Sequence, residues 1–470
     1  MRLSVKILAT AVTAALPALM PTSAMAATND ELLAELRALA ARVQQLEARN
    51  QSLENALSSD YRREADPEVA ARIKTLESET AALREKKGVL DALEGVKVGG
   101  SLLNVVQSAP KRAAANDKSV NELTWRGDLT AEMPAGEVGN TTGKLFAHVR
   151  FGQGDGLTPK LRPAYTGNVN SSTFALGGSS DKSDSTALLA QAWYQLDFGI
   201  PNAFQENDRR FELTIGKMDP FLFFDQNAAA DDESSRFLNN VFVHGAQLDS
   251  GGDVGVDSYG FSPGVRLAYR DESEGSQFWQ LSGAVYGSGN GATYDNSLSQ
   301  PFVIAQAERG VRLFKGLEGT WRAYVWRNGR ATDYDETEAA HTGWGVSIDQ
   351  RIPGGVLLFG RYGHQMSGRV KFDRSVSVGA EISGNNWWRA ADAVGIAFGS
   401  LRTSKGWKAD SMDVAGYEAS GRESVAELYY RWQINPVFEL SPDVQYIRRP
   451  AGNPDAGGVL AYALRAKASF

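Results

Sequence analysis

The residues best suited to bind a solute gather in one stretch, MDPFLFFDQNAAADDESSRF (218–237). Aromatic rings stack on the apolar faces of sugars, while carboxylates and amides form hydrogen bonds with sugar hydroxyl groups. The candidate residues of this stretch are Phe221, Phe223, Phe224, Asp225, Asn227 and Asp231. We therefore predict a sugar-binding segment. Two alternatives stay open: an acidic surface loop whose phenylalanines pack against the protein, and a calcium site at Asp225, Asn227 and Asp231.

A second set of polar side chains recurs at every other position along segments that are otherwise apolar. Its members are Arg126, Asp128, Glu132, Arg150, Glu427, Arg431, Asp443, Gln445, Arg465 and Lys467. Both signs of charge are present, whereas a pore dedicated to anions would favour rings of lysine and arginine. The set therefore favours a neutral polar solute, the alternative being that these side chains are solvated ion pairs.

Enzymatic chemistry has little support in this sequence. The four histidines, at 148, 244, 341 and 364, show neither metal-ligand spacing nor an adjacent nucleophile motif. We expect no catalytic residue, no metal and no cofactor. The net charge of −7 argues against nucleic acid as a partner, because that polyanion attracts basic surfaces.

The elements that position these residues are strands, because from residue 97 onward apolar and polar residues alternate. In the last segment Tyr462 and Leu464 share one face, and Arg465 and Lys467 share the other. A soluble sandwich and a membrane barrel both produce this alternation. Three features favour the barrel: the terminal Phe470, connections that alternate between long and short, and aromatic residues near strand ends. These aromatic residues include Trp125, Trp432, Tyr446 and Tyr462.

The sequence predicts an all-β transmembrane barrel of about 16 antiparallel strands at 96–470. The expected strands are 97–107, 122–133, 143–152, 187–198, 209–217, 263–271, 277–288, 301–312, 317–328, 342–352, 355–363, 371–383, 389–399, 422–434, 436–448 and 458–470. The expected long loops are 153–186, 218–262, 329–341 and 400–421. A barrel of this size can hold an aqueous channel, and the loop 218–262 is the segment expected to narrow it.

The first 95 residues predict export and a helix. Residues 1–26 have a basic start, a short apolar run and Ala24-Met25-Ala26, which together are typical of a cleaved signal peptide. Residues 27–95 predict an α-helical coiled-coil segment, because apolar residues, with Asn50 as the one polar exception, recur at steps of four and three from Leu32 to Leu57. This segment is expected either to self-associate or to pack on the protein's own barrel.

Three stretches resemble the carbohydrate-selective porins of the OprB type. They are GKMDPFLFFDQNAAADD (216–232), RAADAVGIAFG from Arg389, and ELYYRWQINPVFELSPDVQYIRRPAGNP (427–454). The resemblance implies a 16-stranded barrel that admits glucose and other sugars by diffusion, with Arg389 as a further pore-lining candidate. The N-terminal coil departs from the family pattern, and so do Trp387 and Trp388, which crowd the turn before Arg389 and which we expect to alter the pore mouth.

These observations predict a porin in the outer membrane of a Gram-negative bacterium, with periplasmic termini. Small sugars, outer-membrane lipid and, through the coil, other copies of the chain are the expected partners. A general or anion-leaning porin remains an alternative. So does a structural envelope protein that uses the coil as a tether.

Overall fold

The computed structural model describes residues 95–114, 118–161, 168–174, 186–200, 208–249, 260–289 and 296–470. The predicted signal peptide and nearly all of the predicted coil lie outside the described residues, so both stay predictions.

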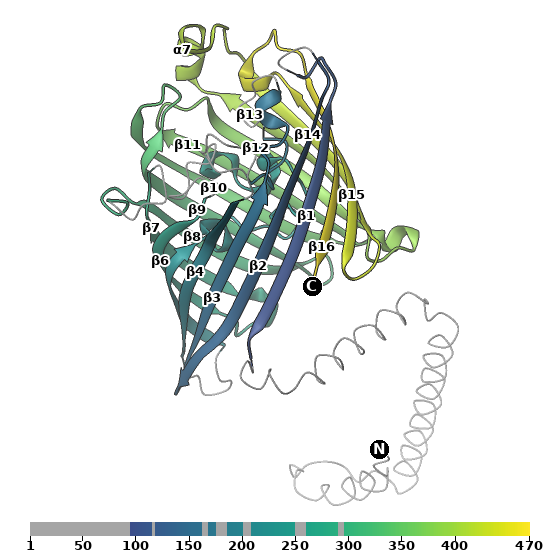
Figure 1. Ribbon diagram of the computed structural model, residues 1–470. Helices are drawn as coiled ribbons and strands as arrows, with labels where there is room; N and C mark the ends of the chain where they lie inside the picture. Colours follow the sequence, from purple (N-terminus) through teal and green to yellow (C-terminus); the bar gives the residue numbers. More distant parts are fainter. Residues whose placement is uncertain are drawn as a thin grey trace, which may run out of the picture. The chain divides into compact units, whose positions relative to one another are not determined.

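The described residues form one closed barrel of 16 antiparallel strands (Figure 1). The strands are β1 Lys97–Ala109, β2 Val120–Val138, β3 Thr141–Gln153, β4 Thr186–Gly199, β5 Arg209–Met218, β6 Ser262–Asp271, β7 Trp279–Tyr286, β8 Phe302–Leu313, β9 Leu317–Thr332, β10 Glu338–Ile352, β11 Val356–Ser367, β12 Phe372–Ser383, β13 Ala393–Thr403, β14 Arg422–Gln433, β15 Phe438–Arg448 and β16 Val459–Ser469. Each strand pairs with its sequence neighbours, and β1 pairs with β16 to close the barrel. The predicted fold is confirmed.

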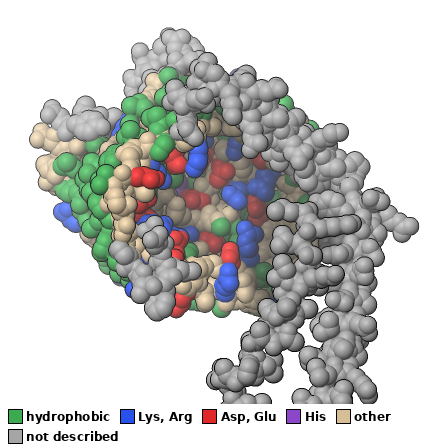
Figure 2. All heavy atoms as spheres, turned by 90° about the horizontal axis from the view of Figure 1, so that it is seen from below, with side chains coloured by type: hydrophobic (Ala, Val, Ile, Leu, Met, Phe, Trp, Pro, Cys, Tyr) green, Lys and Arg blue, Asp and Glu red, His purple; other side chains and the backbone are tan. Residues whose placement is uncertain are grey.

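The alternation of residue types explains which side of each strand faces inward. In β16 the side chains of Ala461, Ala463 and Arg465 are buried, while those of Tyr462 and Leu464 are exposed on the outer wall. The hollow interior, viewed from below in Figure 2, is lined by acidic and basic side chains, and hydrophobic side chains cover the visible outer wall. This is the pattern of a barrel that faces lipid outside and water inside.

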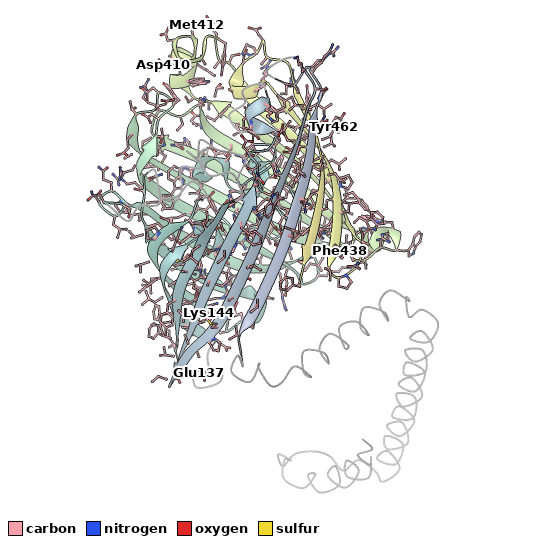
Figure 3. The ribbon with its side chains drawn as sticks, viewed as in Figure 1. Glu137, Lys144, Asp410, Met412, Phe438 and Tyr462 are labelled. Carbon is pink, nitrogen blue, oxygen red and sulfur yellow. The ribbon has the colours of Figure 1, made fainter. Side chains whose placement is uncertain are left out.

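The two ends of the barrel differ in the length of their connections. At the end that we call the turn end, the connections include 139–140, 314–316, 353–355 and 434–437. At the opposite end, the loop end, they include 154–185, 219–261 and 404–421. Figure 3 shows this polarity, with Glu137 near one end and Asp410 and Met412 at the other. The expected loop 329–341 is shorter than predicted, because β9 and β10 extend to leave only 333–337 between them.

Helices occur only in connections within the described ranges. They are η2 Thr158–Lys160, η3 Pro220–Leu222, α5 Asn240–Val243, α6 Ala246–Asp249, η4 Gly275–Gln277, η5 Gly384–Trp387, α7 Lys405–Ala415 and η6 Pro450–Gly452. None of these helices is long and apolar enough to cross a membrane.

The described part of the β5–β6 connection, residues 219–249, folds against the inner wall, and we call it the inner loop. Small inward-facing residues on the wall make room for it. A Cβ atom on Gly399 of β13 would lie 2.6 Å from the Val241 side chain in α5. A Cβ atom on Gly363 of β11 would lie 3.0 Å from the Gln247 side chain in α6. The glycines at these two inward positions therefore let the inner loop approach the sheet closely.

Candidate functional site

The inner loop is attached to the barrel wall by a buried arginine of β11. Arg361 donates hydrogen bonds to the backbone oxygens of Asp225 (2.9 Å), Ala230 (2.7 Å) and Phe242 (2.7 Å). Its Nε atom lies 3.3 Å from a carboxylate oxygen of Asp225. One guanidinium group thus holds the early part of the inner loop, at Asp225 and Ala230, and its later part, at Phe242, against the wall.

Asp225 and Asn227, two of the predicted solute ligands, contribute to this attachment. The buried Asp225 carboxylate accepts a hydrogen bond from the backbone N–H of Gly245 at 2.5 Å. The Asn227 side-chain amide donates to the Ser347 hydroxyl (3.2 Å) and to the Ile348 carbonyl (3.1 Å) on β10. In this structure both residues fix the shape of the inner loop.

The three phenylalanines of the inner loop occupy different environments. Phe221 is buried and stacks on His244, with ring centroids 3.6 Å apart. Phe224 is buried edge-on against Tyr286. Phe223 is half-buried, and the Arg266 guanidinium lies 4.7 Å from its ring centre. Phe223 is therefore the ring of the three that stays accessible beside a polar group.

The tip of the inner loop, residues 233–236, contacts β2 and β16, the two strands that flank β1 in the closed barrel. Arg126 of β2 donates to the Glu233 carboxylate at 2.7 Å. Arg465 of β16 donates to the backbone oxygens of Glu233 (2.9 Å) and Arg236 (2.6 Å). Lys467 of β16 donates to the hydroxyl groups of the two serines between them. The predicted lumen residues Arg126, Arg465 and Lys467 therefore meet at the loop tip.

A second group of predicted lumen residues, on β14 and β15, holds the start of α5. The Glu427 carboxylate accepts the backbone N–H groups of Leu238 (2.5 Å) and Asn239 (3.0 Å). Gln445 accepts from the Asn239 amide at 3.0 Å and donates to Asp443 at 2.9 Å. Charged and amide side chains, rather than apolar packing alone, thus dock this part of the inner loop.

Two further groups of lumen charges form mixed clusters in which each sign faces the other. Asp128 accepts from Arg126 (2.9 Å) and Arg150 (2.6 Å), and it also contacts His148 (2.7 Å). On another part of the wall, Glu381 lies 3.3 Å from both Arg236 and Arg431. These two clusters therefore present paired charges instead of a ring of one sign.

Carboxyl groups of the inner loop have shifted pKa values for identifiable reasons. Burial raises the pKa of Asp231 to about 8, and this effect exceeds the opposing influence of the Arg361 guanidinium. Burial would also raise the pKa of Asp232, but the Lys467 ammonium and the Ser234 hydroxyl hold it at about 2. Neighbouring carboxyl groups thus differ in charge near pH 7.

Arg389 lies apart from these clusters, in the β12–β13 connection at the turn end. It pairs with Asp392 at 2.5 Å. The adjacent Trp387 donates its indole N–H to Tyr430, which shares the outer face of β14 with Trp432. Trp388 is 93% exposed. Trp387 thus lies in the turn before Arg389 with its contact on the outer side of the wall, and the expected effect of the tryptophan pair on the pore mouth stays a prediction.

Sequence reasoning missed several residues that shape the lumen. Arg361 interrupts the apolar run of β11 at an inward position, a signal that period-two reasoning could have used. The β3–β4 connection was missed as a second inward loop: Gln107 and Gln445 both donate to the Val169 carbonyl, at 3.1 and 2.9 Å. Its sequence carries no comparable signal.

The histidines have structural partners. His341 contacts Asp333 at 2.7 Å and His364 lies edge-on to Trp344. No group of three or more histidine, aspartate or glutamate side chains is arranged to hold a metal ion within the described ranges.

Comparison with known proteins identifies the family. The model of the carbohydrate-selective porin family OprB matches residues 150–470, well over half of the chain. The structure is similar to the high-pH structure of Pseudomonas putida OprB, with a TM-score of 0.62 and 16% identity over 82% of this chain and 97% of that one. The outer-membrane channel DcaP of Acinetobacter baumannii aligns with a TM-score of 0.44 and 12% identity, covering 80% of this chain and 97% of that one. A search of curated protein sequences gave no match. The chain therefore belongs to the OprB family of carbohydrate-selective porins, and it is an outer-membrane channel for passive diffusion of small solutes rather than an enzyme.

Proposed function

We propose that this porin prefers uncharged sugars, and that the inner loop provides the narrow part of its lumen. The observation that carries the proposal is the pairing of opposite charges along the lumen, as at Asp128 between Arg126 and Arg150. Paired charges produce a weak net field, so they neither concentrate nor exclude ions strongly. Their remaining hydrogen-bonding capacity suits hydroxyl groups.

Phe223 is the aromatic platform in this proposal. Its ring is half-buried and packs against Trp193 at 5.9 Å between ring centroids, which fixes its orientation. The buried Arg266 guanidinium covers one face of the ring, so a sugar would contact the part of Phe223 that Arg266 leaves exposed. Phe221 and Phe224, which are buried, support the inner loop in this scheme.

We further propose that the loop end faces the exterior and that the turn end and both termini face the periplasm. Short periplasmic turns and longer external loops are usual in bacterial outer-membrane barrels. Outer-membrane lipid then contacts the apolar outer face. The heptad pattern from Leu32 to Leu57 supports self-association of the coil on the periplasmic side.

The test is a titration of the mature protein in a planar bilayer with sugars of increasing length. We expect saturable block of the ionic current. The Phe223→Ala variant should weaken the block, whereas Phe438→Ala, which removes a ring from the outer wall, should leave it unchanged. Conductance without block by any sugar would refute the sugar preference and leave a general porin. A reversal potential that strongly favours anions would identify the anion-leaning alternative.

A further inference from the structure

Four arginines lie at the loop end of four consecutive strands, and we call them the arginine row. They are Arg374 of β12, Arg402 of β13, Arg422 of β14 and Arg448 of β15. Arg422 and Arg448 are exposed, and the other two are half-buried. In β15 the strand begins with Phe438 at the turn end, which Figure 3 labels, and it finishes with Arg448 at the loop end.

The alternation along each strand shows that the arginine row faces outward. In β12 the next residue on the face of Arg374 is Val376, which is exposed on the outer wall. In β13 Arg402 shares its face with the exposed side chain of Phe398. Each arginine thus follows the apolar outward residues of its own strand, on the side of the loop end.

The depth of the row follows from the aromatic residues of β15. Phe438 and Tyr446, both exposed, bracket the apolar outward residues of this strand, and Arg448 is the next outward residue after Tyr446. Interfacial aromatic residues mark the two edges of the apolar band of an outer-membrane barrel. Arg448 therefore lies just beyond the band, at the level of the lipid headgroups.

Three members of the row are direct cross-strand partners. Arg402 pairs in register with Arg374 on one side and with Arg422 on the other. Side chains opposite each other have Cβ atoms about 4.5–5.5 Å apart, and like charges at this spacing destabilise the sheet. Arg448 is opposite Ser424, the next outward residue after Arg422 on β14. The strands therefore concentrate positive charge in one patch of the outer wall.

The arginine row has no carboxylate partner among the described residues, and none of its side chains forms a hydrogen bond there. The Nε atom of Arg374 is buried without an acceptor in these ranges. Glu423, the residue after Arg422, faces inward and accepts from the backbone N–H of Ala451. The anion that would offset the repulsion is therefore expected from outside the described chain.

We propose that the arginine row binds the phosphate groups of a lipid of the outer leaflet. The planar fork of a guanidinium group can bond to two phosphate oxygens at once. Because several guanidinium groups lie side by side, the row favours a lipid with more than one phosphate group, such as lipid A. The acyl chains of this lipid would lie on the apolar wall that includes Val376 and Phe398. The inference rests on the proposed orientation of the barrel and does not depend on the sugar preference.

Native mass spectrometry of the mature protein with added lipid A tests the site. Arg402→Gln removes the central charge of the row and should weaken lipid A binding by at least about tenfold, because a charged bidentate contact is lost. Arg402→Lys should have a smaller effect, because it keeps the charge without the fork. The matched control is Arg327→Gln on β9, which removes an exposed outward arginine whose cross-strand partners are Val303 and Thr342.

Arg327→Gln should bind lipid A as the wild type does, and heat-dependent mobility in gels checks that each barrel is folded. A folded Arg402→Gln barrel with wild-type affinity for lipid A, or an equal loss in both glutamine variants, would overturn the proposal. Phosphatidylglycerol, which has a single phosphate group, should bind more weakly than lipid A. Equal binding of the two lipids would contradict the assignment to a lipid with several phosphate groups.

A separate measurement tests the orientation on which the outer leaflet depends. The chain contains no cysteine, so Met412→Cys, at an exposed position of α7, reports the loop end alone. A polyethylene-glycol maleimide too large to pass through a porin should label this variant in intact cells. Labelling only after the outer membrane is broken would overturn both the orientation and the outer-leaflet site, whereas the sugar preference is judged by the block of current.

Discussion

Replacing Arg361 with methionine tests whether the inner loop sets the pore. The substitution removes three charged hydrogen bonds to backbone oxygens and leaves the Asp225 carboxylate buried without its cation. Hydrogen bonds from a charged donor contribute about 1.5–3 kcal/mol each, and breaking a buried pair costs about 3–5 kcal/mol. Because these terms overlap, we expect a loss of about 5 kcal/mol in the docking of the loop.

A loss of this size in docking free energy is enough to open a local segment, so the part of the inner loop bonded to Arg361 should leave the barrel wall. The hydrogen-bonded ladder of the barrel does not involve the Arg361 side chain and should persist. In a planar bilayer we expect a larger and noisier single-channel conductance and at least about a tenfold weaker sugar block, which corresponds to about 1.4 kcal/mol.

Two related variants sharpen this test. Arg361→Lys keeps the charge beside Asp225, but a single ammonium cannot reproduce the planar fork that reaches three carbonyls, so its effect should be intermediate. Combining Arg361→Met with Asp225→Asn also removes the buried, unpaired charge of the Asp225 carboxylate, and it should recover part of the lost docking free energy of the loop. A folded Arg361→Met channel with wild-type conductance and sugar block would refute the reasoning.

Three further predictions concern the inner loop. Because the pKa of Asp231 is about 8, its carboxyl group is neutral at pH 6 and charged at pH 9. Raising the pH should therefore shift the reversal potential in a salt gradient toward the value for a cation-selective channel, and Asp231→Asn should abolish this shift. Glu427→Leu removes the acceptor of two backbone N–H groups and should make the inner loop more sensitive to added protease, whereas an unchanged cleavage rate would count against this anchor. Gly399→Val places a side chain where Val241 packs, so it should displace the inner loop from the wall and raise the conductance. The control is Gly283→Ala, whose Cβ atom meets no atom closer than 3.8 Å and which should behave as wild type.

The barrel could be predicted because each strand carries the same local signal, an alternation of apolar and polar residues. Each strand shows its inward side by alternation, and the side chains of Arg126, Glu427 and Arg465 are buried on the inner side of the wall. Strand ends were less certain, because hydrogen bonding continues into polar residues, as in β9 and β10. The inner loop has no such period, so its sequence indicated suitable residue types but not their depth. Phe221 and Phe224 therefore lie in apolar packing, while Phe223 stays accessible.

Arg389 shows the limit of a short resemblance. Its stretch matches the family pattern, yet the residue pairs with Asp392 in a connection at the turn end. Only the three-dimensional arrangement separates this position from the lumen clusters around Asp128 and Glu381. The solute-binding roles of all these residues stay predictions.

The attachment of the loop tip to both β2 and β16 has a consequence for the order of assembly. Glu233 accepts from Arg126 of β2, and its backbone accepts from Arg465 of β16, the strand that pairs with β1 to close the barrel. These two arginines become neighbours only after the first and last strands have joined. An open, partly inserted sheet consequently lacks the complete binding surface for the tip, which reaches its final position only in a sealed barrel. The sugar preference that we propose for the inner loop would therefore be acquired late in biogenesis, when the wall is complete.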